Sequence, residues 1–350
     1  MEPIRKILLY RLGSLGDSLL ALPAFYLVRQ RYPTAEITFL SNVPVNAKAA
    51  PLLEIVHNTT LCNEVVEYPI RLRSPFRLWQ LVRRLRAGRY GLLVHLTASR
   101  GMVNSIRDFL FFKLCGINRI IGVPLRIDDL QCRFLTGLGQ FEWEAARLAR
   151  RVEDSVEVDL GDDQYWDLQL SADEAKAAEA LLESHGIRDG FICASVGSKT
   201  DAKDWMDVNW ERLLVLLSIV SRDYDLVLIG STGEHARTER LAQLWSGRVA
   251  NLCGKVGVRV NAALLKRARV FIGHDSGPMH LAATVKTPSV GIFSAQGLPG
   301  QWAPRGNNNT IFYRQTPCFG CGLEQCLEYN KQCILSISPD EVARAVLKYL

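Results

Sequence analysis

The chain has 350 residues, of which 48% are apolar, and it carries a net charge of +6. This length and apolar content allow a large core and suggest two domains. No apolar run approaches the roughly 20 residues that a membrane-spanning helix requires, and the first residues lead into a strand-like run with no evident signal peptide. Five of the nine cysteines are scattered singly, as in a reducing compartment. We therefore expect a cytoplasmic globular protein.

The first expected strand, residues 7–10, is followed by a glycine-bearing turn over 11–17 and a helix to about Arg31. The turn lacks both the Gly-Lys-Ser/Thr ending of a P-loop and the three-glycine spacing of a dinucleotide site. It leaves one carboxylate, Asp17, at the carboxyl end of the strand, where open α/β sheets bind their ligands. Asp17 could act as a base towards a hydroxyl, or it could simply stabilise the helix N-terminus.

Further strands are expected to alternate with helical segments, which predicts a doubly wound parallel sheet. These strands lie near residues 36–40, 64–68, 91–96 and 120–123.

A basic helix is predicted within residues 71–89. This stretch contains seven arginines and no acidic residue, and Leu78, Leu81, Val82 and Leu85 recur at helical spacing. The pattern suits an anionic membrane surface or an anionic acceptor. The alternative is a solvated arginine face over an ordinary core stripe. We expect no nucleic-acid partner, because no recognised binding motif accompanies the patch.

An acidic stretch at 159–163 is expected to link the two domains, and a second series of strands and helices follows it. The turn after the strand at 191–195 carries Ser198 and Lys203. A hydroxyl and an ammonium group at the end of a strand suit a diphosphate, although exposed loop lysines are common. Glu234 follows another strand, where a carboxylate can accept hydrogen bonds from ribose hydroxyls or merely favour the helix dipole.

Residues 270–283 read as a strand, a tight turn and a helix. Ser276 is a good N-cap and Pro278 suits the first helical turn, while Gly277 would let an anion approach the free N–H groups of the helix. The consecutive residues His274, Asp275 and Ser276 cannot form the spaced relay of a catalytic triad. The turn is therefore predicted to bind an anion, and the alternative is an ordinary turn with a capping serine and a core histidine.

The tail contains four closely spaced cysteines, Cys318, Cys321, Cys326 and Cys333. They match the ligand count of an all-thiolate site for zinc or iron. A reduced surface loop or an occasional disulfide is the competing interpretation. A last helix is expected from Pro339 to Leu350.

Four short features in register resemble glycosyltransferase family 9, the ADP-heptose:lipopolysaccharide heptosyltransferases. They are Gly16-Asp17, Lys203-x-Trp205, Gly230-x3-Glu234 and Asp275-Ser276-Gly277-x2-His280. The resemblance implies a GT-B fold, which consists of two Rossmann-like domains facing across a cleft. It divides the chain into an acceptor-binding domain (1–160), a sugar-nucleotide-binding domain (161–335) and a C-terminal helix (336–350) that packs back on the first domain.

The resemblance also implies an inverting transfer of heptose from ADP-heptose, with no metal required. The acceptor would be a hydroxyl of an anionic, lipid-linked oligosaccharide of the lipopolysaccharide inner core, at the inner leaflet of the inner membrane. Matching positions imply roles for seven residues: Asp17 as general base, Lys203 on the diphosphate, Glu234 on the ribose, Asp275 on sugar hydroxyls, and Ser276, Gly277 and His280 beside the phosphates.

Two motif positions depart mildly from the family pattern, since Met206 and Ser276 stand where Pro and Thr are common. The acceptor side matches no assignable pattern. A different sugar nucleotide, a protein acceptor or a non-catalytic sugar-nucleotide binder therefore remain alternatives.

Overall fold

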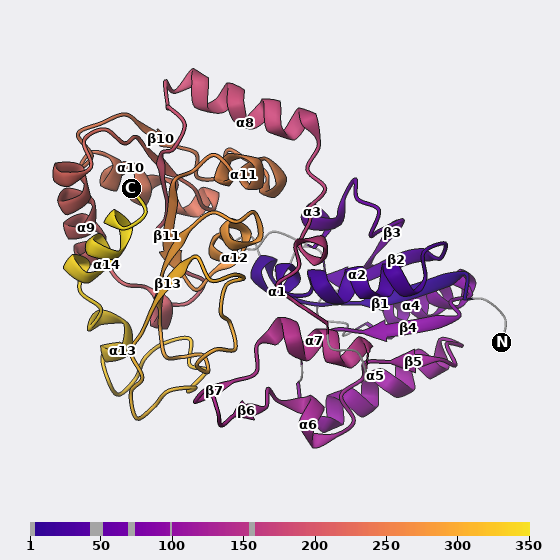
Figure 1. Ribbon diagram of the computed structural model, residues 1–350. Helices are drawn as coiled ribbons and strands as arrows, with labels where there is room; N and C mark the ends of the chain where they lie inside the picture. The colour runs from indigo at the N-terminus through magenta and orange to yellow at the C-terminus, as the bar shows by residue number, and fades with distance from the viewer. Residues whose placement is uncertain (1–3, 43–51, 69–73, 99, 154–157) are drawn as a thin grey trace. The chain divides into compact units, whose positions relative to one another are not determined.

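The computed structural model describes the chain except for residues 1–3, 43–51, 69–73, 99 and 154–157 (Figure 1). The chain divides into two compact units, Met1–Trp166 and Asp167–Leu350. Each unit is built on its own parallel sheet. Among the described helices, none combines the length and the apolar character that crossing a bilayer demands.

The first unit contains a five-stranded sheet in the order β3-β2-β1-β4-β5. Its strands are β1 (Lys6–Tyr10), β2 (Glu36–Asn42), β3 (Glu64–Tyr68), β4 (Leu92–His95) and β5 (Ile120–Ile121). Every pairing is parallel, with Ile7 of the central strand opposite both Ile37 and Leu92. From Ile7 to Tyr10 strand β1 is continuously buried, because helices cover both faces of such a sheet. The strand order reverses between β1 and β4, which is where doubly wound sheets open to a ligand.

The helices of the first unit begin with α1 (Leu15–Leu19) and α2 (Leu22–Arg31). The prediction of one continuous helix to Arg31 is wrong, because the helix is interrupted at Leu20–Ala21. Pro23 lacks an N–H group and stands in the first turn of α2, so it favours a new helix start there. The remaining elements are α3 (Leu53–Val56), α4 (Pro75–Gly88), α5 (Met102–Leu114), α6 (Ile127–Leu130), the antiparallel pair β6 (Phe134–Leu135) and β7 (Gln140–Phe141), α7 (Glu144–Val152) and the short turn η1 (Asp163–Tyr165).

The second unit repeats this plan with one more strand, in the order β10-β9-β8-β11-β12-β13. Its strands are β8 (Ile192–Ser195), β9 (Leu226–Leu228), β10 (Val249–Asn251), β11 (Val270–His274), β12 (Ser289–Phe293) and β13 (Asn309–Tyr313). The order reverses between β8 and β11, so the turns that follow these two strands lie at the same edge. The helical elements are α8 (Ala172–Ser184), η2 (Asp201–Lys203), α9 (Asp207–Val220), η3 (Thr232–Glu234), α10 (His235–Ala242), α11 (Val258–Leu265), α12 (Gly277–Thr284), α13 (Gln332–Leu335) and α14 (Pro339–Leu347).

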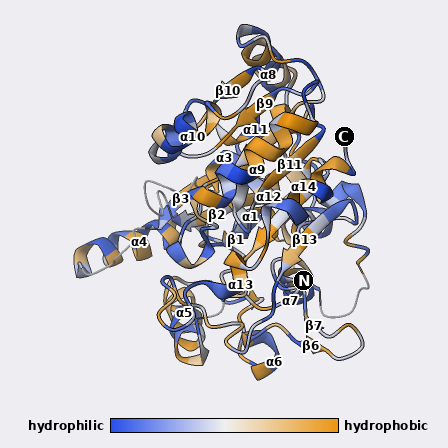
Figure 2. Ribbon diagram, turned by 90° about the vertical axis from the view of Figure 1, so that its left-hand side faces the viewer, coloured by the Kyte–Doolittle hydropathy of each residue, from blue (hydrophilic) through white to orange (hydrophobic). Residues whose placement is uncertain are grey.

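The last helix, α14, belongs to the second unit. Val342 and Val346 are fully buried in the same core as Trp205 and Trp210, and α14 packs against α9. Figure 2 shows the apolar β11 of this unit in orange. The apolar face of α14 is therefore covered by the core of the second unit. The prediction that residues 336–350 pack back on the first unit stays a prediction.

Candidate functional site

The Asp17 carboxylate is fixed by its own turn. Its Oδ2 atom accepts hydrogen bonds from the backbone N–H (2.7 Å) and the hydroxyl (2.5 Å) of Ser14. A Cβ atom at Gly13 would lie 2.7 Å from the Cβ of Asp17, so this close approach requires glycine. The helix-capping alternative for Asp17 is thus realised in the structure. It occupies only one of the two carboxylate oxygens.

The other oxygen of Asp17 faces a buried cation that the sequence did not single out. The Arg11 side chain is fully buried, and its Nη2 lies 3.9 Å from Asp17 Oδ1. The guanidinium also donates to the carbonyl of Leu96 (2.5 Å) and to the carbonyl of Asp17 itself. Burial lowers the pKa of Arg11, and the neighbouring Asp17 and Glu144 carboxylates oppose that change. The sequence feature that could have indicated this role is the position of Arg11, a charged residue directly after the buried strand β1.

Three predicted donor-binding residues converge in the second unit. Lys203 Nζ lies 2.6 Å from Asp275 Oδ2, and His280 Nε2 lies 3.6 Å from Asp275 Oδ1. The Asp275 side chain is only 9% exposed. Burial alone would raise the pKa of this carboxyl, but the Lys203 ammonium and His280 hold its pKa well below the usual range. Asp275 is therefore an ionised carboxylate that is paired with the Lys203 ammonium.

Unused donors surround this cluster at the N-terminus of α12. Ser276 occupies the N-cap position, but its hydroxyl makes no capping hydrogen bond. Within the described part of the chain, the buried Ser276 Oγ and His280 Nδ1 atoms have no hydrogen-bond partner. Gly277 is the first residue of the helix, where backbone N–H groups also lack intrahelical partners. Buried polar groups are normally satisfied, so this arrangement is suited to an anionic, hydroxyl-bearing ligand.

The loop that carries Lys203 is clamped from a neighbouring helix. Arg237 of α10 donates to both carboxylate oxygens of Asp204 (2.9 and 3.0 Å) and to Asp207 (2.5 Å). No pattern in the sequence indicates this contact between Arg237 and the loop. Ser198, by contrast, donates from its hydroxyl to the carbonyl of Thr200 within the loop (2.9 Å), and not towards the Lys203 cluster.

Glu234 joins the turns that follow β8 and β9. Its Oε2 accepts from the N–H of Ser231 (2.9 Å). A Cβ atom at Gly197 would lie 2.0 Å from Glu234 Oε1, and one at Gly230 would lie 2.2 Å from Oε2. The two glycines therefore leave the space that this carboxylate occupies, and a side chain at either position would displace the end of Glu234. The predicted contact of Glu234 with a ribose stays a prediction.

The four cysteines of the tail are all free and line one hollow, together with side chains that include Tyr329 and Lys331. In the part of the chain that the structure describes, no group of three or more His, Cys, Asp or Glu side chains is arranged to hold a metal ion. The metal prediction for Cys318, Cys321, Cys326 and Cys333 is therefore not supported.

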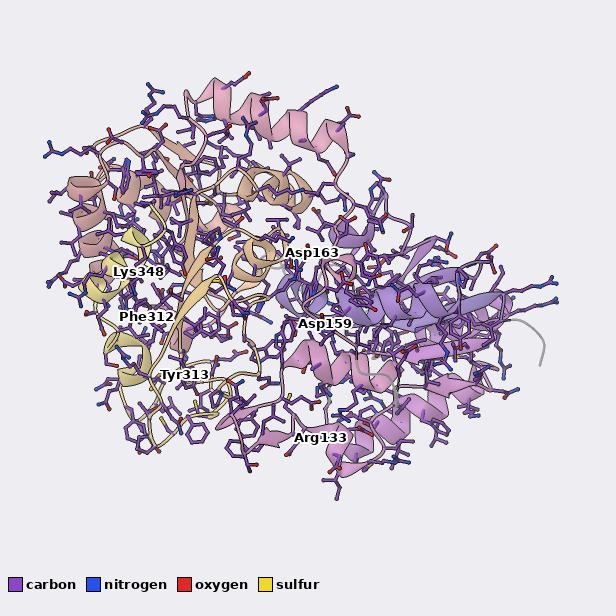
Figure 3. The ribbon with its side chains drawn as sticks, viewed as in Figure 1. Arg133, Asp159, Asp163, Phe312, Tyr313 and Lys348 are labelled. Carbon is purple, nitrogen blue, oxygen red and sulfur yellow. The ribbon has the colours of Figure 1, made fainter. Side chains whose placement is uncertain are left out.

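Tyr313, labelled in Figure 3, donates from its hydroxyl to the carbonyl of Gly297 (3.0 Å). Burial raises the pKa of Tyr313 to about 12, and the thiols of Cys333 and Cys321 add to this rise. The Tyr313 hydroxyl is therefore neutral near pH 7.

Comparison with known proteins defines the class. The profile of "Glycosyltransferase family 9 (heptosyltransferase)" matches residues 143–332, more than half of the chain. The protein is a glycosyltransferase, and it belongs to glycosyltransferase family 9.

Individual relatives extend the likeness along the whole chain. Lipopolysaccharide heptosyltransferase 3 of Escherichia coli K12 is 24% identical over 96% of this chain and 95% of its own length. The structure of a family 9 glycosyltransferase from Veillonella parvula superposes with a TM-score of 0.74 at 17% identity, covering 99% of this chain and 97% of that one. The E. coli ADP-heptose lps heptosyltransferase II superposes with a TM-score of 0.68 at 18% identity, covering 98% of both chains. The predicted family and GT-B fold are confirmed.

Proposed function

We propose that the protein transfers a heptose from ADP-heptose to a hydroxyl of a lipopolysaccharide inner-core acceptor, with inversion at the anomeric carbon. The names of the two E. coli relatives support this choice of donor and acceptor class. The observation that carries the proposal is the buried Asp275 carboxylate between Lys203 and His280 at the free N-terminus of α12. This group of charges and donors has the composition that a sugar diphosphate needs.

Donor binding would use this cluster as follows. Lys203 exchanges its bond to Asp275 for the diphosphate, which releases a carboxylate oxygen for the sugar hydroxyls. Ser276, the Gly277 N–H and His280 donate to the phosphates, and Glu234 accepts from the ribose. Ser198 lies in the same loop as Lys203, and its hydroxyl would donate to the diphosphate after releasing the carbonyl of Thr200. Fixed donors of this kind stabilise the charge that develops on the leaving ADP, each worth about 2.7–4 kcal/mol in the barrier.

Asp17 is the proposed general base. The acceptor oxygen attacks the anomeric carbon from the face opposite the diphosphate while the bond from carbon to the phosphate oxygen breaks. The bonding electrons leave with ADP, and the hydroxyl proton goes to Asp17. Oδ1 is the suitable oxygen, because Oδ2 already accepts two hydrogen bonds from Ser14. General-base catalysis typically contributes about 10²–10⁴-fold to the rate.

The test is product formation from ADP-heptose and truncated lipopolysaccharide acceptors, followed by mass spectrometry. Asp17→Asn should lower kcat about 10²–10⁴-fold while ADP still binds. Asp173→Asn is the matched control, because Asp173 is also a first-turn carboxylate, and it should leave kcat unchanged. Normal turnover by Asp17→Asn would rule out the base. Turnover only with another sugar nucleotide or with a protein acceptor would redefine the substrate, and ADP binding without turnover on any acceptor would indicate a binding protein.

We also propose that α4 brings the enzyme to the inner-membrane surface where such acceptors reside. Phe76 and Trp79 are 63% and 52% exposed, their rings stack at 6.2 Å, and Arg83 lies over Trp79 at 4.7 Å. Leu81 and Leu85 of the same helix are buried in the core. Exposed aromatic rings between arginines are suited to the interface of an anionic bilayer.

Vesicle flotation tests this surface. The protein should float with vesicles that contain phosphatidylglycerol and stay behind with pure phosphatidylethanolamine–phosphatidylcholine vesicles. A Phe76→Ser, Trp79→Ser variant should lose flotation. Ile219→Ser is the control, since Ile219 is 58% exposed on α9 in the other unit. Equal flotation of all three proteins would exclude α4 as the docking surface.

A further inference from the structure

His274 connects two loops of the donor-binding unit. It is the last residue of β11, and its side chain is fully buried. The backbone N–H of Trp205 donates to His274 Nε2 (3.2 Å), and His274 Nδ1 lies 3.0 Å from the carbonyl oxygen of Gly197. Because Trp205 N–H is a donor, Nε2 must be the bare nitrogen, and Nδ1 must carry the proton that it donates to Gly197. The ring is therefore a neutral bridge with a defined tautomer.

The packing around the ring leaves little freedom to this bridge. The Trp210 ring meets the His274 ring edge-on at 5.4 Å and the Trp205 ring at 5.5 Å. Trp205 is itself anchored, because its indole N–H donates to the carbonyl of Ile337 (2.9 Å). Trp205, whose backbone N–H donates to His274, is thus held by its packing on Trp210 and by its indole hydrogen bond.

The bridge ends at Trp205, two residues after Lys203. A shift of Trp205 would move Lys203, whose ammonium lies 2.6 Å from Asp275. Asp275 directly follows His274 on the same strand end. His274 therefore helps to fix the Lys203 ammonium and the Asp275 carboxylate relative to each other. Because its ring is fully buried, it does so without contacting a ligand.

We propose that His274 is a positioning residue for donor binding: its two hydrogen bonds hold the loop 197–205 so that Lys203 meets the diphosphate. This inference rests on the proposed role of Lys203. Burial of the ring disfavours the imidazolium and lowers the pKa of His274 to about 4, which keeps the Nε2 acceptor available at neutral pH. Asp204, Arg237 and Lys203 are the charged groups that face it.

Two amide variants separate the two hydrogen bonds. In His274→Gln the amide oxygen reaches the position of Nε2 and can still accept from Trp205. In His274→Asn the amide group reaches only the position of Nδ1, so it can serve Gly197 but leaves Trp205 N–H unpaired. A buried donor without a partner costs about 1–3 kcal/mol. In calorimetric titrations with ADP, His274→Asn should therefore bind roughly tenfold more weakly than the native chain, and His274→Gln should bind almost as well.

The Lys203→Ala background distinguishes positioning from general packing. If His274 acts through the ammonium, adding His274→Asn to Lys203→Ala should weaken ADP binding little further. Circular dichroism and thermal unfolding check that each variant folds. An ADP affinity of His274→Asn equal to that of the native chain, or fully additive losses in the double variant, would overturn the positioning role. A Lys203→Ala variant that binds ADP normally would instead refute the proposed role of Lys203, and with it the premise of the inference.

Discussion

At the scale of single residues, the Ser14 hydroxyl decides how Asp17 is held. In Ser14→Ala the backbone N–H bond to Oδ2 remains and the hydroxyl bond of 2.5 Å is lost. We expect a stability loss of about 1 kcal/mol, as for other capping residues, and a severalfold lower kcat because the carboxylate can rotate. Ser171→Ala is the control, since Ser171 belongs to a capping box of α8. It should cost similar stability, measured by urea unfolding, and leave kcat unchanged. A kcat loss shared by both variants would contradict this reasoning.

The lowered pKa of His274 gives a second prediction at this scale. Its ordinary value is 6.5 and burial brings it to about 4, so between these pH values the unfolded chain binds the proton that the folded chain rejects. Stability from this group is complete above pH 6.5 and falls as the pH drops towards 4, by about 3 kcal/mol at most. His274→Gln cannot bind this proton. The free energy of unfolding should therefore fall more between pH 7 and pH 5 for the native chain than for this variant, and parallel pH profiles would contradict the prediction.

The sequence identifies the residues of this site unevenly. Asp17, Lys203 and Asp275 could be named because each stands in a short motif after a strand. Arg11 and His274 could not be assigned their roles, because those roles depend on tertiary partners. His274 bonds to Gly197 and Trp205, which precede it by 77 and 69 residues. Single-sequence patterns carry no information on such contacts.

At the scale of elements, the buried strands were the easiest to predict. Strand β1 was expected at residues 7–10 and spans Lys6–Tyr10, since a strand that is buried on both faces is a continuous apolar run bounded by polar turns. The hairpin of β6 and β7 was missed because its strands have two residues each and are partly exposed. The contacts of α14 with α9 could not be predicted for a different reason: an apolar helix face shows that a partner exists but does not identify it.

The hydrogen bonds from Arg237 to Asp204 lead to a prediction for the loop that carries Lys203. Arg237→Lys replaces the two-pronged contact with Asp204 by a single point charge, so the loop should loosen. Hydrogen exchange of the amides at 201–206 should become faster, and stability should fall by about 1–2 kcal/mol. Arg240→Lys is the control, because the Arg240 side chain is 66% exposed and its Nη2 lies 3.2 Å from Asp207 Oδ2. Unchanged exchange in Arg237→Lys would show that other contacts alone hold the loop.

At the scale of the whole molecule, the two units divide the proposed chemistry between them. Asp17 and its Arg11 support belong to Met1–Trp166, whereas every residue proposed to hold ADP belongs to Asp167–Leu350. Each unit has its own sheet and its own buried core. A unit with a core of this kind has the properties of an independently folding domain. Donor binding and base catalysis should therefore be separable.

This separation predicts that the fragment 167–350 folds and binds ADP without catalysing transfer. It retains the bonds from Arg259 to the carbonyls of Leu168 (2.9 Å) and Gln169 (2.8 Å), which fix its first residues to α11. Thermal unfolding should be cooperative and should shift upwards with ADP, because a ligand of the folded state stabilises it. The same fragment with Lys203→Ala should show a smaller shift. Unfolding without cooperativity would show that the core of the fragment does not stabilise it alone. A folded fragment whose melting temperature does not change with ADP would indicate that the first unit contributes part of the nucleotide site.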